Sequence, residues 1–186
     1  LRKYMPITWI TSLLGSLALI GTPLFAGFYS KDHIIVAAWE RGAAFGVLAM
    51  LGAAITAFYM TRLMMMTFFG EKRWAKGVHP HESPGVMVVP LVVLAIGSAA
   101  LGMLLNSAIQ TWLAPPTGHH PHTTALWEVP WQGWITLVLV LIGVGVGYLM
   151  YRGEISYEQP RTKNPVVYIG RNDLLADQFN DADFVR

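Results

Sequence analysis

Residues 20–33 read IGTPLFAGFYSKDH, and they place a lysine and an aspartate inside an otherwise apolar segment that runs from Ile7 to Trp39. Charged side chains at membrane depth are costly and are usually functional. Gly21, Pro23 and Gly27 fall in the same stretch. Proline lacks the N–H that a helix interior needs, and glycine is a weak helix former. These residues predict two half-helices joined by irregular backbone.

The composition of the whole chain is that of a membrane protein. Of its 186 residues, 54% are hydrophobic and only 13% are charged, and the mean hydropathy is +0.45. The chain has no cysteine, which excludes a disulfide framework and a thiolate site. No nucleotide-binding loop or nucleic-acid surface is evident, and no nucleic-acid partner is expected. Because the chain begins at Leu1 without a signal pattern, we expect a fragment.

Four regions supply the roughly 20 apolar residues that a helix needs to cross a membrane. They are residues 6–40, 43–69, 86–105 and 131–151. The sequence therefore predicts an all-α, polytopic transmembrane helix bundle with four segments, of which the first is discontinuous. Residues 1–152 would form the membrane domain and residues 153–186 a short cytoplasmic tail.

Basic residues are divided unevenly between alternate connectors, which predicts orientation. Arg41 alone lies on one side. The other side carries Arg2, Lys3, Lys72, Arg73, Lys76, Arg152, Arg161, Lys163, Arg171 and Arg186. We expect the N-terminus and the tail to be cytoplasmic.

Two interpretations of the charged stretch fit the residues. In the first, Ser30 caps the second half-helix, Asp32 lies in its first turn, and a buried Lys31 gains and loses a proton, with His33 as a further titrating group. In the second, residues 7–29 form one continuous helix and Lys31 extends to the interface.

Several motifs in the chain resemble subunit L of the proton-pumping NADH-quinone oxidoreductase, respiratory complex I. They are LRKYMP at 1–6, GSLAL at 15–19, GTPLFAGFYSKD at 21–32, TAFYMTRL at 56–63, TFFG at 67–70 and HESP at 81–84. The resemblance implies the C-terminal part of that subunit, with its discontinuous twelfth transmembrane helix at the start of this chain.

The resemblance also implies roles for residues. Lys31 would be the terminal lysine of a charged axis, held by Asp32 when protonated, and both would take part in proton translocation. His33 stands where the family usually has an acid, and it is a candidate proton relay. The tail would lead toward a long lateral helix beyond residue 186.

By the same resemblance the chain is an antiporter-like, proton-translocating subunit of an enzyme, in a bacterial plasma membrane. No cofactor is expected in this chain, since flavin, iron–sulfur clusters and quinone would be bound by other subunits. Its partners would be the lipid bilayer and other membrane-arm subunits, chiefly the neighbouring antiporter-like one. Two alternatives are a subunit of a multi-subunit sodium–proton antiporter and a structural membrane scaffold.

Residues outside the charged stretch have simpler interpretations. Arg62 either extends to the interface or forms an ion pair with a neighbouring helix. Glu82 is expected to accept hydrogen bonds locally, where the third span enters the membrane. No metal site is expected, because the histidines lie in proline-rich connectors without cysteine. They are His79, His81, His119, His120 and His122.

Overall fold

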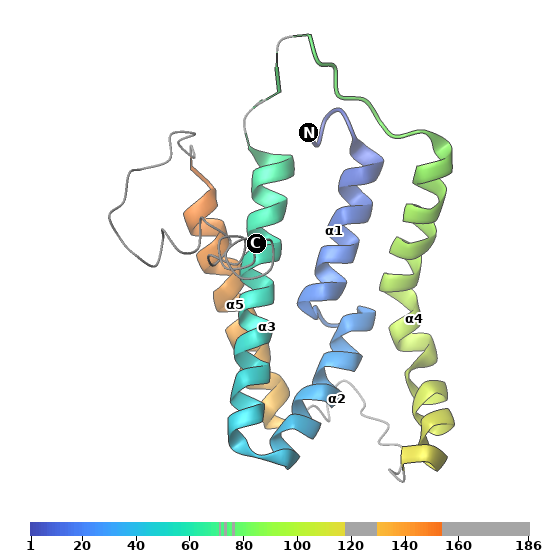
Figure 1. The fold of residues 1–186 in the computed structure, drawn as a ribbon, viewed down its shortest axis with the longest axis vertical. Helices are drawn as coiled ribbons and strands as arrows, with labels where there is room; N and C mark the ends of the chain where they lie inside the picture. Colours follow the sequence, from blue (N-terminus) through green and yellow to red (C-terminus); the bar gives the residue numbers. More distant parts are fainter. Residues whose placement is uncertain (71, 73, 76, 118–129, 154–186) are drawn as a thin grey trace, which may run out of the picture. The chain divides into compact units, whose positions relative to one another are not determined.

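The computed structural model describes residues 1–70, 72, 74–75, 77–117 and 130–153, all within one compact unit, Leu1–Glu154. In this part of the chain every regular element is helical, which confirms the all-α fold. The elements are α1 (Pro6–Ile20), α2 (Ala26–Arg41), α3 (Ala43–Met64), which continues as the π-helical turn η1 (Met65–Phe69), α4 (Gly85–Thr117) and α5 (Trp131–Tyr151) (Figure 1).

Three of these helices are long and apolar enough to cross a membrane: Ala43–Phe69, Gly85–Pro115 and Trp131–Tyr151. Their outward side chains, such as Leu48, Leu94 and Leu141, are exposed. An apolar outer surface suits lipid, which offers backbone groups no hydrogen bonds and so favours helices. The protein is a multi-pass membrane protein. Helix α1 is apolar too but shorter.

The described helices pack so that α1 and α2 follow one another between α3 and α4 (Figure 1). Helix α3 packs along α5, and the interface depends on small residues. A Cβ added at Gly143 would collide with the carbonyl of Ala54, and one at Gly147 would lie 3.0 Å from Cβ of Thr61. Such close approach of backbones is the usual basis of helix association in membranes.

Helix bounds agree with the expected spans at residues 43–69 and 131–151 but not elsewhere. The span expected to end at residue 105 is wrong at its end, because α4 continues to Thr117. Asn106 does not begin a connector. Its side-chain oxygen accepts a hydrogen bond from Gln110, four residues along the same helix, at 2.9 Å, and such pairs support a helix.

Two expected features lie outside the described residues. The first is the histidine cluster of His119, His120 and His122, together with the rest of 118–129. The second is the tail from residue 154 to residue 186. Both remain predictions.

Candidate functional site

The chain between α1 and α2 forms a compact break over residues 21–25. Gly21 adopts φ +86°, a left-handed conformation that glycine takes without steric cost. Its N–H donates to the carbonyl of Ala18 at 3.1 Å, and the N–H of Thr22 donates to that of Leu17 at 3.0 Å. These two bonds form the Schellman arrangement that ends many helices. A defined cap, and not a loose kink, therefore terminates α1.

Lys31 reaches back from α2 to this capped end. Its ammonium Nζ donates to the carbonyl oxygen of Ile20, the last residue of α1, at 3.3 Å. The alkyl stem lies over Gly21, because a Cβ added there would be 3.1 Å from Cδ of Lys31. Carbonyls at a helix C-terminus lack intrahelical partners and carry the negative end of the helix dipole. The half-buried lysine thus neutralises an open helix end.

The expected starting point of the second half-helix is wrong. Helix α2 begins at Ala26 after an extended Phe25, so Ser30 lies inside it and its hydroxyl donates to the carbonyl of Gly27 at 3.3 Å. Asp32 consequently lies in the second turn, not the first. Gly27, expected in the break together with Gly21 and Pro23, is also helical.

Gly27 instead makes room for the contact between the two half-helices. A Cβ at this position would overlap the carbonyl of Ala18 on α1, and a Cβ at Gly102 on α4 would overlap the backbone of Ala26. The first turn of α2 is therefore packed between α1 and α4. This packing fixes the distance from which Lys31 reaches Ile20.

Asp32 does not hold Lys31 in this structure. Neighbouring residues on a helix project in different directions, and no ion pair involving Lys31 or Asp32 is found within the described ranges. The half-buried Asp32 carboxylate accepts no hydrogen bond from that part of the chain. The partner of Lys31 is a backbone carbonyl.

His33 faces a different helix. Its Nε2 lies 2.9 Å from the amide nitrogen of Gln110 on α4, and that nitrogen also donates to Asn106. Sequence analysis missed both amides because it assigned them to a connector. Their spacing of four residues between apolar neighbours, which puts both on one helix face, is the signal that could have found them.

Glu82 caps α1 from a loop far away in the sequence. Its carboxylate accepts the N–H of Ile7 at 2.9 Å, the N–H of Thr8 at 3.3 Å and the hydroxyl of Thr8. Those amides belong to the first turn of α1, which lacks intrahelical partners. The Thr8 hydroxyl, followed by the backbone amides, holds the pKa of Glu82 below its ordinary value. A backbone hydrogen bond from the neighbouring Ser83 also lowers this pKa. The expectation that Glu82 accepts hydrogen bonds locally, at the entry to the next span, stays a prediction, and the contacts with α1 are an additional role that the sequence did not indicate.

Arg62 and the described histidines lie apart from this site. The exposed guanidinium of Arg62 lies over the ring of Tyr151, 5.4 Å from its centroid, and it has no acidic partner in the described part of the chain. His79 and His81 are exposed. The absence of a metal site stays a prediction.

A cavity of about 340 Å³ lies next to the break. Its walls are almost entirely apolar and come from α1, α3 and α5, and from Thr22 and Pro23 of the break. Lys31, Asp32 and His33 do not line it. Lys31 instead contacts the end of α1, and His33 contacts α4.

Comparisons with known proteins identify the family. Residues 1–56, which contain the break and Lys31, match the model of the membrane family described as NADH:quinone oxidoreductase/Mrp antiporter. Over its whole length the chain is 44% identical to NADH-quinone oxidoreductase subunit L of Mycobacterium tuberculosis. The chain belongs to the subunit L family.

Other members of the subunit L family match most of the chain. The subunit L of Neisseria meningitidis serogroup A is 36% identical over 84% of it, and NAD(P)H-quinone oxidoreductase chain 5 of a Picosynechococcus species is 34% identical over 90% of it. The chain spans less than a third of the length of these relatives, with 30% of the Mycobacterium protein covered.

Proposed function

We propose that this chain is part of an antiporter-like, proton-translocating membrane subunit of an NADH-quinone oxidoreductase, and that Lys31 carries the proton. The observation that carries the proposal is the hydrogen bond from the Lys31 ammonium to the carbonyl of Ile20 at a capped helix break. Irregular backbone and buried cations occur in membranes mainly where ions or protons are handled. The names of the relatives support the same assignment.

In this proposal α1 and α2 together make one discontinuous crossing, which brings the number of transmembrane segments to four. Helix α1 has 15 residues and α2 has 16, and neither reaches the roughly 20 residues that a full crossing needs. Lys31, on α2, is near the junction between them, because its ammonium hydrogen-bonds the last residue of α1.

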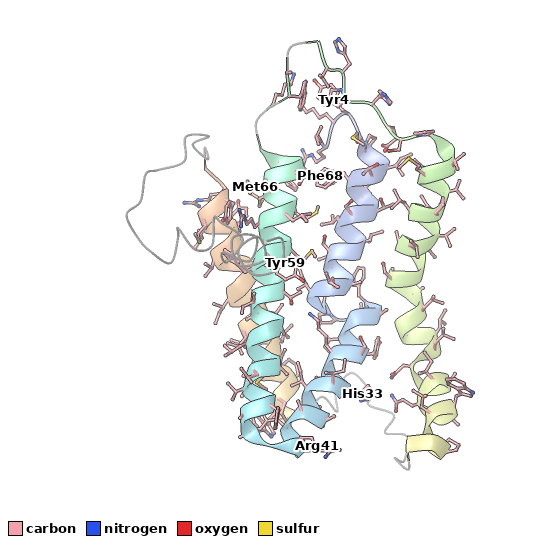
Figure 2. All side chains as sticks on the ribbon, in the orientation of Figure 1. Tyr4, His33, Arg41, Tyr59, Met66 and Phe68 are labelled. Carbon is pink, nitrogen blue, oxygen red and sulfur yellow. The ribbon has the colours of Figure 1, made fainter. Side chains whose placement is uncertain are left out.

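The distribution of basic residues supports an orientation in a bacterial plasma membrane. Tyr4 and Arg41 lie at opposite ends of the described helices, with His33 between them on α2 (Figure 2). Lys72 lies 5.5 Å from the ring centroid of Tyr4, so it shares the end of Arg2 and Lys3. We assign this basic end to the cytoplasm.

The proposed proton step depends on whether Lys31 keeps its contact with Ile20. A protonated Lys31 is stabilised by the negative end of the α1 dipole, an effect worth up to about 2 kcal/mol in partly buried geometries. A shift of α1 against α2 that breaks the contact removes this stabilisation and favours release of the proton. Such a shift, or a charge arriving from a neighbouring helix, would couple the site to events elsewhere.

Electron transfer would take place in other subunits, which would bind the flavin, the iron–sulfur clusters and the quinone. The neighbouring antiporter-like subunit and the rest of this subunit would supply the path by which protons reach Lys31. Asp32, which has no hydrogen-bond partner among the described residues, is the acid that remains available to such a neighbour.

A second candidate is a subunit of a multi-subunit sodium–proton antiporter, because the description of the matching family names Mrp antiporters as well. Both candidates use the same break and lysine. Transport that depends on sodium and continues without NADH would favour the antiporter.

The test is Lys31→Ala in the full-length subunit, with proton pumping and NADH-to-quinone turnover measured in membranes that contain the assembled complex. We expect pumping to be lost. Lys31→Arg should also impair it, because arginine does not release its proton. Lys3→Ala, which removes an exposed lysine at the basic end, is the matched control. Normal pumping by assembled Lys31→Ala would overturn the proposal and leave the chain as a structural scaffold.

A further inference from the structure

A hydrogen-bonded contact between polar side chains joins α2 to α4 beside the charged stretch. Three side chains form it: His33 on α2, and Asn106 and Gln110 on α4. Helix α4 has no charged residue. Its hydroxyls at Ser98 and Thr111 bond carbonyls of α4 itself. In the described part of α4, the side-chain hydrogen bond that reaches another helix is therefore made by the amide of Gln110.

The geometry centres on one atom, Nε2 of Gln110. It lies 2.9 Å from Nε2 of His33 and 2.9 Å from Oδ1 of Asn106. An amide NH₂ group has two hydrogens, and an imidazole nitrogen that accepts one of them cannot carry its own proton. The arrangement therefore places the proton of a neutral His33 ring on Nδ1.

A second arrangement of the same side chains is equally complete. If both amides turn over, the oxygen of Gln110 accepts from Nε2–H of His33 and from the NH₂ group of Asn106. Each form of Nε2, with or without a proton, then has a partner. Since an unpaired buried polar group is costly, this pair of amides removes a penalty that His33 would otherwise meet when it changes protonation state.

We propose that Gln110, held by Asn106, is a positioning residue that orients His33 and lets it exchange a proton during transport. The inference rests on the proposed function, because it assumes a proton path at Lys31. It adds α4 to that path through a side chain that, in the described part of the chain, hydrogen-bonds His33 and no other titratable group.

Few other titratable groups surround His33. On α2 they are Tyr29, one turn before His33, then Lys31 and Asp32, and Asp32 interacts electrostatically with His33. Glu40 and Arg41 lie near the far end of the same helix. Helices α1 and α4 contain no acidic, basic, histidine or tyrosine residue. Helix α3 contributes Tyr59 and Arg62, and α5 contributes Tyr148 and Tyr151; none of these four hydrogen-bonds His33.

The first experiment is a double-mutant cycle in the assembled complex, with Gln110→Leu and His33→Phe made singly and together. Protons pumped per NADH oxidised are measured. We expect Gln110→Leu to lower this ratio about two- to tenfold, the worth of one hydrogen bond, and to have no further effect in His33→Phe. The matched control is Thr111→Val, which removes a hydroxyl that bonds Ser107 on the same helix. A Gln110→Leu effect that is equal in both backgrounds would overturn the inference.

The second experiment uses Gln110→Glu, which keeps the size of the side chain. A carboxylate accepts from a protonated ring but has no hydrogen to donate to a neutral one. Proton pumping is measured as a function of pH. We expect the acidic limb of this pH profile to move to higher pH by about one unit, and we expect no such shift with Thr111→Val. An unmoved profile would overturn the inference. Normal pumping by Lys31→Ala would instead count against the proposed function, so the two failures are distinguishable.

Discussion

The α3–α5 pair and the α1–α2 pair both pack closely at a glycine, but they differ in whether a backbone carbonyl at the contact lacks an intrahelical partner. Gly143 lies against the carbonyl of Ala54 in the first pair, and Gly27 lies against the carbonyl of Ala18 in the second. Neither carbonyl is the open end of its helix: Ala54 lies in the interior of α3, and Ala18 accepts the N–H of Gly21. Only the second pair ends a helix at the contact, so that Ile20 offers an open carbonyl to a cation. An interruption beside a tight contact thus provides a cation site within apolar surroundings.

The largest effect should come from filling the tight contacts. Gly27→Val and Gly143→Val would each place a side chain where a backbone carbonyl already lies, and overpacking of this kind costs about 1–3 kcal/mol or more. We expect both to lower the thermal stability of the full-length subunit in detergent. Gly145→Val is the control, since a Cβ there meets no atom within 4 Å.

Gly27→Val and Gly143→Val should have similar effects on stability but different effects on proton pumping. At equal assembly, Gly27→Val should reduce pumping more than Gly143→Val, because it separates Lys31 from Ile20. Equal pumping by the two variants would mean that the α1–α2 contact has no role of its own.

A smaller effect should follow from Gly21→Ala. A residue with a Cβ at φ +86° is strained by about 1–2 kcal/mol, and the new methyl group would press on the stem of Lys31. Gly77→Ala carries the same kind of strain, at φ +93°, but meets no neighbour. We expect Gly21→Ala alone to lower the pumping ratio at equal turnover. If both variants pump equally, the position of Lys31 is not sensitive to the break.

The smallest effect should come from the far end of α1, through Glu82. Because the folded-state pKa of Glu82 is depressed by its hydrogen bonds, its contribution is present above the ordinary carboxylate pKa and is lost as pH falls through the folded value. Thermal melting at neutral pH should show Glu82→Gln to be less stable than the natural chain, and this difference should shrink in acid. Glu40→Gln, at an exposed position, should change little at any pH.

Local patterns predicted part of this molecule well. The bounds of residues 43–69 and 131–151 follow from apolar length and interfacial tryptophans, and the break follows from Gly21 and Pro23. The start of α2 was mispredicted because a glycine in a helix costs only about 1 kcal/mol, and close packing of Gly27 on α1 offsets it.

The contacts of the site depend on residues that are distant in the sequence. Glu82 lies 75 positions from Ile7, and Gln110 lies 77 positions from His33, so no periodicity connects them. The role of Lys31 was suggested by its apolar surroundings, but its acceptor was not, because the Ile20 carbonyl is a backbone atom that every residue possesses.

Helix α1 is held at both ends by charged side chains from other parts of the chain. At one end, the carboxylate of Glu82, on the loop before α4, accepts hydrogen bonds from α1. At the other end, the ammonium of Lys31 donates a hydrogen bond to it. With 15 residues, α1 is a rod about 22 Å long. If α1 moves as a rigid body, a displacement of this loop would also displace the Ile20 carbonyl that accepts the Lys31 hydrogen bond.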